Sequence, residues 1–366
     1  MDGRRLGPVL LVSGLLGLTA ILALNPALRE PNLWRLGGQG GVDDSAEHPT
    51  VDLGVDLAVV LEPEPPAQPS PAPALPSDAA LPRMVDGRHY PLVPSDPHRT
   101  ASLLAAVEEA LRDPDTPAAA LPRLGHQQQV IYRVLARDPQ RSEGVLAALP
   151  ERWRPVARHH LAARREFLAM HRGHRGLVNL PAWRIIPPAP AEELLAHYRK
   201  AAAATGIAWE VLAAINLVET GMGRIDGVSV ANAQGPMQFL PTTWAQPGVG
   251  QGNIRDPHDA IQAAARYLVR RGGLQDIRKG LWGYNNSDRY GRAVLHYAAL
   301  LRDDPRAYTG LYHWEIHFHA EAGDLWLPVG YSQNQPLAVG TWLQRMPASA
   351  PPRPGSSAAG GDRALQ

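Results

Sequence analysis

Residues 209–220 read WEVLAAINLVET, and this segment indicates the fold class most clearly. Leu212, Ile215 and Val218 recur at a spacing of three residues, which predicts a helix with an apolar stripe on one face. Glu219 follows Leu212 by seven residues and Ile215 by four. Side chains at these offsets share a helical face, so the carboxyl group of Glu219 is predicted to lie on or beside the buried stripe.

Further helices are predicted on both sides of this segment. They cover residues 192–204, ended by Gly206; residues 241–244, capped by Thr242 or Thr243; a helix from Asp256 and Pro257 to Gly272 and Gly273; and a long helix capped by Ser287 or Asp288 and terminated by Pro305. Asp followed by Pro is a typical helix start, because Asp caps free N–H groups and Pro fits the first turn. No segment of residues 190–302 has the pattern of a good strand, so this domain is predicted to be mainly α-helical.

A smaller helical region is predicted before this domain. Its helices begin near Thr100, where Pro114 closes the first, and continue over residues 127–136 and 154–170. Arginines concentrate between Arg152 and Arg175, and histidines lie among them: His159, His160, His171 and His174. These basic side chains either form a solvated helix face or contact acidic polymers or lipid headgroups, and the solvated face is the favoured interpretation.

The segment HWEIHFH at residues 313–319 alternates like a β-strand. His313, Glu315, His317 and His319 fall on one face, and three aromatic or aliphatic residues fall on the other. A zinc site is the alternative interpretation, but alternate strand residues lie about 7 Å apart, so other elements would have to complete it. We therefore expect an exposed polar face over an apolar inner face.

Composition excludes several classes of protein. The formal net charge of +1 does not favour nucleic-acid binding, and the absence of cysteine excludes disulfides, thiolate metal sites and cysteine nucleophiles. The 36 prolines and 34 glycines concentrate towards the two ends of the chain, which predicts a disordered linker at residues 30–98 and a disordered tail at residues 346–366.

The N-terminus resembles a membrane-targeting segment. Arg4 and Arg5 precede an uncharged apolar run from Leu6 to Leu24, which is long enough to cross a bilayer. An uncleaved anchor is favoured over a cleaved signal peptide, because the run is long and no clear cleavage site follows it. In either case the positive-inside rule places the rest of the chain outside the cytoplasm.

Four separated motifs now point to a family. They are LVETGMGRIDG at residues 217–227, ANAQGPMQFLPTTW at 231–244, DPHDAIQAAARYL at 256–268 and YNNSDRYGRAVLHYA at 284–298. Their order and spacing resemble the lytic transglycosylases with a lysozyme-like helical domain, and within them the membrane-bound murein transglycosylases that carry GPMQFLP. The resemblance covers residues 183–308 tightly, and departs from the usual pattern at Val230, Ala231 and Asn232.

The resemblance implies a role for each matching residue. Glu219 would be the catalytic acid, Thr220 its hydrogen-bonding neighbour, and Met237 and Gln238 sugar contacts. Tyr284 would position Glu219, and Asn285 would stabilise the same loop. The implied substrate is the glycan strand of peptidoglycan, with no cofactor, no metal and no nucleic acid. The N-terminal helix would be the contact with the membrane.

The proposed chemistry depends on one protonated carboxyl group. Cleavage of a β-1,4 glycosidic bond needs a proton donor, and burial on an apolar helix face raises the pKa of a glutamate. Most glycosidases use a second carboxylate, and Asp226, Asp256 and Asp288 are candidates by residue type alone. A transglycosylase needs none, because the C6 hydroxyl of muramic acid attacks C1 and Glu219 accepts its proton.

Two alternatives stay open beside the lytic transglycosylase: a hydrolytic muramidase on the same scaffold, and a non-catalytic peptidoglycan-binding protein of the cell envelope.

The chain is divided into a transmembrane anchor or signal segment at residues 1–29, the linker at 30–98, a helical accessory region at 99–180, a lysozyme-like transglycosylase domain at 181–310, a C-terminal extension at 311–345 and the tail at 346–366.

Overall fold

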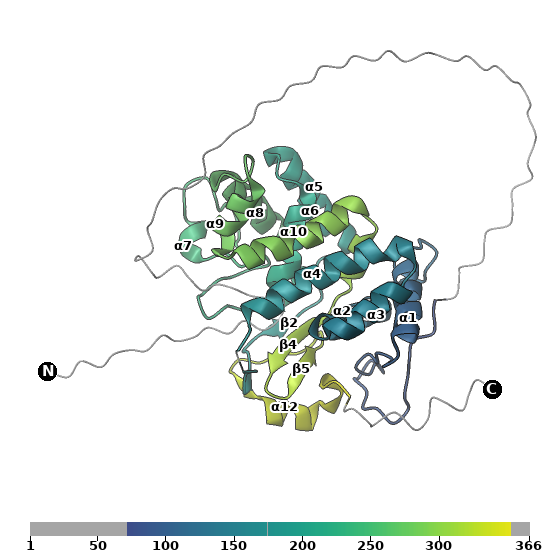
Figure 1. The fold of residues 1–366 in the computed structure, drawn as a ribbon. Helices are drawn as coiled ribbons and strands as arrows, with labels where there is room; N and C mark the ends of the chain where they lie inside the picture. The colour runs from purple at the N-terminus through teal and green to yellow at the C-terminus, as the bar shows by residue number, and fades with distance from the viewer. Residues whose placement is uncertain (1–71, 174, 353–366) are drawn as a thin grey trace, which may run out of the picture.

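The computed structural model describes residues 72–173 and 175–352 (Figure 1). Among these residues no helix is long and apolar enough to cross a membrane. The predicted anchor at residues 1–29 lies outside the described residues, as do most of the predicted linker and the last part of the predicted tail.

Four helices precede the segment around Glu219: α1 (Pro97–Ala110), α2 (Leu121–Arg137), α3 (Pro139–Ala148) and α4 (Arg154–Met170). Asp96 and Asp138 cap α1 and α3, each accepting a hydrogen bond from a backbone N–H of the first turn, and each is followed by proline. The predicted helix at residues 154–170 is confirmed with the same bounds. The separate helix α3 was not predicted, because its 10 residues carry too few apolar side chains to show a period.

Seven helices follow: α5 (Ala191–Thr205), α6 (Trp209–Thr220), α7 (Pro241–Trp244), α8 (Pro257–Arg270), α9 (Ile277–Asn285), α10 (Asp288–Asp303) and α11 (Ala307–Tyr312). The predicted ends are confirmed at Gly206, at Asp256 and at Ser287, which caps α10. The predicted threonine cap of α7 is wrong, since the helix begins at Pro241 and its cap position is Leu240, which makes no side-chain cap.

Three short antiparallel strand pairs and a last helix complete the fold. They are β1 (Asn179–Leu180) with β6 (Leu337–Ala338), β2 (Arg184–Ile185) with β3 (Ile225–Asp226), and β4 (Ile316–Ala320) with β5 (Gly323–Leu327), followed by α12 (Val339–Arg345). In the β4–β5 hairpin, His317 lies opposite Trp326 and His319 opposite Asp324. The two-residue strand β3 lies within residues 190–302, where no strand was predicted. Apart from it, the domain is mainly α-helical, as predicted.

The predicted exposed polar face of residues 313–319 is wrong for Glu315 and His317 and holds for His319. Glu315 is 6% exposed and His317 is fully buried, although both belong to the face that was expected to meet solvent. The segment packs against α2, where His126 forms a hydrogen bond with His317 through the two Nε2 atoms at 3.0 Å. Glu315 and His317 are covered because the helical accessory region lies over the side that the alternation marked as polar, whereas His319 at the end of the strand is exposed.

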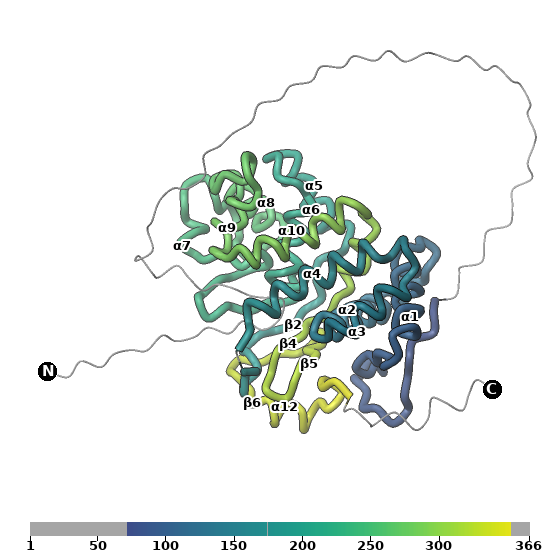
Figure 2. The backbone as a smooth tube through the Cα atoms, in the orientation of Figure 1, coloured from purple at the N-terminus to yellow at the C-terminus, as the bar shows by residue number. Residues whose placement is uncertain are grey.

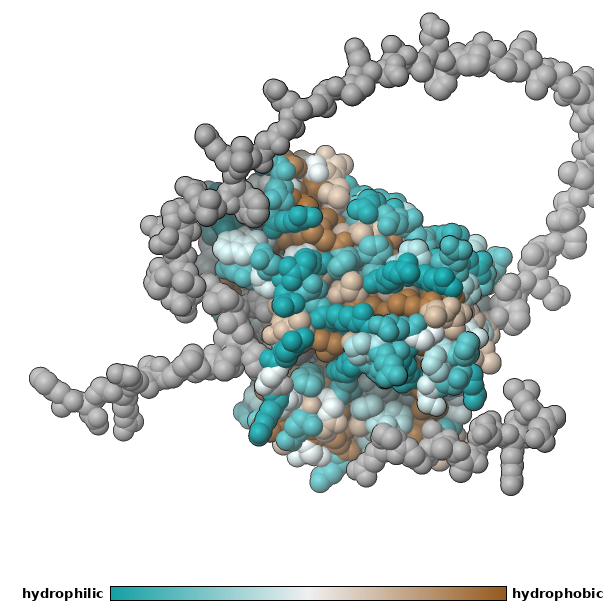
Figure 3. Space-filling model, in the orientation of Figure 1, coloured by the Kyte–Doolittle hydropathy of each residue, from teal (hydrophilic) through white to brown (hydrophobic). Residues whose placement is uncertain are grey.

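Helix α4 joins the two helical regions. It packs against α10 on one side and α2 on the other, as the ribbon and the tube both show (Figures 1 and 2). One hydrophobic cluster runs through both regions, including Ile131 of α2, Phe167 of α4, Leu212 of α6 and Val294 of α10. The division at residues 180 and 181 therefore does not separate two cores. On the face shown in Figure 3, hydrophilic residues dominate and apolar residues fill narrow bands between them.

The ends of the packed region extend further than predicted. Met84 and Tyr90 are each 6% exposed and form a small apolar cluster with Trp326 and Ala348. Ser349 is fully buried and donates a hydrogen bond to the backbone carbonyl of Trp326. The linker expected to reach residue 98 and the tail expected from residue 346 are thus both partly packed, because Met84 and Tyr90 of the first and Ala348 and Ser349 of the second pack against the β4–β5 hairpin.

Candidate active site

Glu219 is the penultimate residue of α6 and is 4% exposed. The helix ends directly after it because Gly221 adopts a left-handed conformation, with φ of 62°, and donates its N–H to the carbonyl of Leu217. Ile316 of β4 lies against this glycine, where an added Cβ would be 2.6 Å from its side chain. The carboxyl group is therefore held at a helix end that the β4–β5 hairpin supports.

The carboxyl group of Glu219 has one hydrogen-bond donor among the described residues. Tyr290 of α10, itself fully buried, donates its hydroxyl to Oε1 of Glu219 at 2.7 Å. Burial raises the pKa of Tyr290 well above its usual value, and the charge of Glu219 adds to this, so the phenol remains a donor. Tyr290 was not predicted as a site residue, although it stands six residues after Tyr284 in the same motif.

Burial also raises the pKa of Glu219 to about 8, against a smaller lowering by the Tyr290 hydrogen bond. No arginine, lysine or histidine of the described residues forms an ion pair with Glu219. A buried acid without a counter-charge is normally costly, and it keeps its proton near neutral pH. This is the protonation state that a general acid requires.

Two of the three aspartates considered as second carboxylates have other partners, and the third is exposed. Asp226 of β3 forms ion pairs with Arg184 of β2 and with Arg255, which precedes α8. Asp256 caps α8, and Asp288 is exposed in the first turn of α10. None of them shares a hydrogen bond with Glu219, so the described residues offer a single buried acid at this position.

Thr220 holds a loop and does not bind the carboxyl group. Its hydroxyl donates to the carbonyl of Pro236 at 2.6 Å, and Asn216, one turn earlier on α6, donates to the same oxygen at 2.8 Å. The hydroxyl of Thr220 contacts the carbonyls of Asn216 and Pro236 and the N–H of Gly223, so the predicted hydrogen bond to Glu219 is wrong. The physical reason is that the carbonyl of Pro236 lies within hydrogen-bond distance of the Thr220 hydroxyl and accepts from it together with Asn216.

The loop containing Met237 and Gln238 is a tight turn fixed at both ends. Gln234 and Phe239 exchange backbone hydrogen bonds of 2.9 and 3.0 Å. Gly235, with φ of 73°, lies so close to the carbonyl of Ile254 that a Cβ would be 1.9 Å from its oxygen. Only glycine fits there, so this residue sets the path of the loop beside α6.

The two predicted sugar contacts differ in their exposure. Met237 is fully buried, and its backbone carbonyl accepts a hydrogen bond from Tyr284 at 2.8 Å. Gln238 is half-buried, with a left-handed φ of 49°, and its amide donates to the carbonyl of Gly235 at 2.9 Å. Of the two side chains, that of Gln238 alone reaches the surface.

Tyr284 was predicted to position Glu219, but its hydroxyl bonds Met237. Its ring stacks on that of Tyr290, which forms the hydrogen bond to Glu219. The two tyrosine rings are parallel to within 3°, with centroids 6.5 Å apart, and the hydroxyl of Tyr284 is engaged by Met237. Burial, and then the charge of Glu219, raises the pKa of Tyr284 well above its usual value. Asn285 is 9% exposed at the C-terminal end of α9, beside this pair.

The segment that contains the buried acid, the clamped GPMQ loop and the tyrosine pair matches a known family. Residues 197–297 match the transglycosylase SLT domain. The match runs from α5 into α10 and contains Glu219, the clamped loop and both tyrosines. It suggests lytic transglycosylase activity on peptidoglycan. No curated protein and no solved structure matches the chain.

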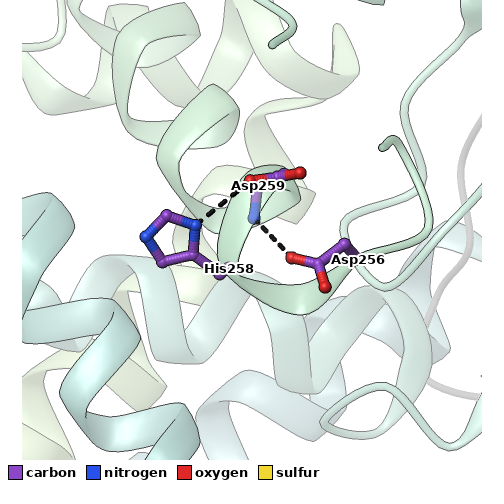
Figure 4. Close-up of side chains that lie close together, drawn as sticks. All are labelled: Asp256, His258 and Asp259. Atoms are coloured by element: carbon purple, nitrogen blue, oxygen red, sulfur yellow. Dashed lines mark hydrogen bonds and ion pairs between the residues drawn. The ribbon is translucent and has the colours of Figure 1, made fainter. Parts of the chain in front are cut away.

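One group of side chains outside the Glu219 region has ligand atoms close enough to share a cation. The ligand atoms of Asp256, His258 and Asp259 lie within 4.8 Å of one another (Figure 4). Asp256 accepts a hydrogen bond from the backbone N–H of Asp259, and His258 contacts the Asp259 carboxylate at 3.1 Å. The hydrogen bond to Asp256 is the N-cap of α8, so this contact has a structural role.

Proposed function

We propose that this protein is a lytic transglycosylase that cleaves the β-1,4 bond between N-acetylmuramic acid and N-acetylglucosamine in peptidoglycan. The observation that carries this proposal is the state of Glu219, which is buried, without an ion pair among the described residues, and has a pKa raised to about 8. Perturbed acids of this kind concentrate in functional sites, because they cost stability and serve no packing purpose.

In the first step, Glu219 donates its proton to the glycosidic oxygen that leaves C1 of the muramic acid. The C1–O bond breaks, and positive charge develops on C1 and the ring oxygen. The carboxylate left on Glu219 stabilises this charge, while Tyr290 keeps its hydrogen bond to Oε1 and holds the group in place.

In the second step, the C6 hydroxyl of the same muramic acid attacks C1, and Glu219 accepts the hydroxyl proton. A C1–O6 bond forms, the product is a 1,6-anhydromuramic end, and Glu219 is protonated again for the next cycle. No water is consumed and no second carboxylate is needed. The attacking group is part of the substrate, which gives it a large effective concentration.

The clamped loop supplies the proposed substrate contacts. Gln238 offers a side-chain amide at the surface beside Glu219, and Tyr284 and Asn285 border the same region. We propose Gln238 as the sugar contact of the loop, with Met237 acting through its backbone carbonyl, which fixes Tyr284. Thr220 is proposed to act on the substrate only indirectly, through the loop.

Two other functions make different predictions. A hydrolytic muramidase would produce ends that are one water heavier, and it would need a base for that water, whereas no aspartate of the described residues forms a hydrogen bond with Glu219. A non-catalytic peptidoglycan-binding protein would give no reason for an unpaired buried acid. Digestion of peptidoglycan sacculi followed by mass analysis of the products separates all three.

We also propose an extracytoplasmic location, since peptidoglycan lies outside the membrane. The support for it is the apolar run from Leu6 to Leu24 after Arg4 and Arg5. A fusion of residues 1–98 to a reporter enzyme that is active only outside the cytoplasm tests it. Membrane fractionation of the same fusion distinguishes an uncleaved anchor from a cleaved signal peptide.

A further inference from the structure

Asn216 of α6 has hydrogen-bond partners on two other segments of the chain. It is fully buried, and so is Tyr198 of α5, whose hydroxyl donates to Oδ1 of Asn216 at 2.5 Å. Nδ2 of Asn216 donates to the carbonyl of Pro236 at 2.8 Å. Helices α5 and α6 pack side by side (Figure 1). These two contacts therefore join α5, α6 and the clamped loop, residues 234–239, in one buried chain of hydrogen bonds.

The partners of Asn216 fix the orientation of its amide group. A carbonyl oxygen can only accept a hydrogen bond, so Nδ2 must be the atom that faces Pro236. Oδ1 then faces Tyr198, and burial raises the pKa of that phenol well above its usual value, so it remains a donor. Nδ2 also contacts the hydroxyl of Thr220 at 3.3 Å. Reversal of the amide would set its oxygen against the carbonyl oxygen of Pro236.

The contact with Pro236 links the two parts of the proposed active site. Asn216 precedes Glu219 by three residues on α6, and Pro236 precedes Gln238 by two residues in the clamped loop. Residues three apart on a helix are neighbours on its surface. The hydrogen bond between Asn216 and Pro236 thus ties the loop that carries Gln238 to the helical turn that carries Glu219.

Other hydrogen bonds of the clamped loop have different effects. Those between Gln234 and Phe239 lie within the loop, so they fix its shape and leave its distance from α6 free. Tyr284 holds the carbonyl of Met237, but Tyr284 belongs to α9. The distance between the loop and α6 is therefore set from the α6 side, where Asn216 takes part.

We propose that Asn216 is a positioning residue for glycan binding: held by Tyr198, it keeps Gln238 at the distance from Glu219 that a bound sugar requires. The inference rests on the proposed function, because it takes Gln238 as the sugar contact of the loop. Asn216 and Tyr198 are both fully buried, so neither touches the substrate. Tyr198, on a neighbouring helix, acts on sugar binding only through Asn216.

Tyr198→Phe is the main variant, because it removes the donor to Asn216 and leaves every residue of the loop unchanged. Tyr308→Phe is its matched control. The ring of Tyr308 packs against that of Tyr198 with centroids 6.5 Å apart, and its hydroxyl donates to the carbonyl of Ala191 on α5 at 3.0 Å. The control thus removes a tyrosine hydroxyl that bonds the same helix and does not reach the loop.

Binding and cleavage are measured separately on the full chain in a mild detergent. Calorimetry in the Glu219→Gln background gives the dissociation constant for soluble glycan strands, and initial rates of the active protein give KM and kcat. We expect Tyr198→Phe to weaken binding and raise KM by about fivefold or more and to keep kcat within about twofold, because it removes binding shared by ground and transition states. Tyr308→Phe should bind as the unaltered protein does.

The alkaline limb of activity should stay in place in Tyr198→Phe, because no hydrogen bond among the described residues joins Tyr198 to Glu219. Asn216→Leu removes both hydrogen bonds at similar volume, should weaken binding at least as much, and decides the question if Tyr198→Phe does not fold.

Two results overturn the proposal: equal glycan binding by the Tyr198→Phe and Tyr308→Phe proteins, or no glycan binding in the Glu219→Gln background. Failure of the proposed function looks different, since the wild type would then bind glycan without cleaving it and the binding constants would still rank the variants.

Discussion

The hydroxyl group of Tyr290 on α10 lies 2.7 Å from Oε1 of Glu219 on α6 and donates a hydrogen bond to it. The contact crosses the interface between the two helices, both of which pack within the common core. The position of the acid is therefore fixed by helix packing as well as by its own helix. Because Tyr290 is fully buried, its hydroxyl has no solvent to exchange with and remains oriented towards the carboxyl group.

Replacement of Tyr290 by phenylalanine should shift the pH profile of the enzyme. The Tyr290 hydrogen bond lowers the pKa of Glu219, so its loss should raise that pKa further and move the alkaline limb of activity to higher pH. We expect activity at neutral pH to fall by about 10- to 100-fold, because the carboxyl group loses its orientation. Initial rates of glycan cleavage across the pH range check both effects.

Tyr331→Phe is the control for this variant, since its hydroxyl bonds the backbone carbonyl of Pro181 and has no part in the proposed site. It should lower stability somewhat and leave the alkaline limb in place. If Tyr290→Phe gives a profile that superimposes on that of the wild type, the hydrogen bond does not tune Glu219.

Glu219 should make the folded protein less stable as the pH rises. Its pKa in the folded state, about 8, lies above its ordinary value of 4.5. Between these values the unfolded chain loses the proton and the native protein keeps it, so stability falls by about 1.4 kcal/mol for each pH unit. Below pH 4.5 both states are protonated, and the stability is fully present.

The neutral variant Glu219→Gln should therefore melt at a higher temperature than the wild type at pH 8, and the difference should shrink towards pH 4.5. Melting temperatures at pH 4.5, 6 and 8 measure this trend. Glu210→Gln, in the first turn of the same helix, is the matched control for removing a carboxylate from α6. A constant difference between Glu219→Gln and wild type at all three pH values would contradict the raised pKa.

The loop beside Glu219 should not tolerate a side chain at position 235. Gly235→Ala and Gly248→Ala both place alanine at a left-handed φ, 73° and 76°, so both carry a strain of about 1–2 kcal/mol. At Gly248 nothing lies within 4 Å of the added Cβ, whereas at Gly235 the carbonyl of Ile254 blocks it. The clash should cost about 1–3 kcal/mol more.

Urea unfolding of the two alanine variants measures this difference directly. The Gly235→Ala variant should also lose most of its cleavage activity, since the loop that carries Gln238 must move. Equal stability of the two variants would show that the loop is free to shift away from Ile254.

Much of the helical framework could be predicted from the sequence. The bounds of α4 and α6 and the starts of α8 and α10 follow from apolar periodicity and from caps such as Asp256 and Ser287. These signals are local, since they depend on residues a few positions apart. The burial of Glu219 was predicted in the same way, from its offset to Leu212 and Ile215.

Contacts between distant segments could not be predicted in this way. The partner of Glu219 lies 71 residues away on α10, and the burial of His317 depends on His126, 191 residues away. The family resemblance implied that Thr220 is the hydrogen-bonding neighbour of Glu219, whereas the three-dimensional fold directs its hydroxyl to Pro236. The alternation in residues 313–319 predicts the strand, but it carries no information about the helices that cover Glu315 and His317.

The central claim is that Glu219 alone carries out a cleavage that consumes no water. Mass analysis of sacculus digests produced by the wild type, Glu219→Gln and the control Glu210→Gln tests it most directly. We predict 1,6-anhydromuramic ends from the wild type and from Glu210→Gln, and no products from Glu219→Gln. Products that are one water heavier, or cleavage that persists in Glu219→Gln, would contradict it.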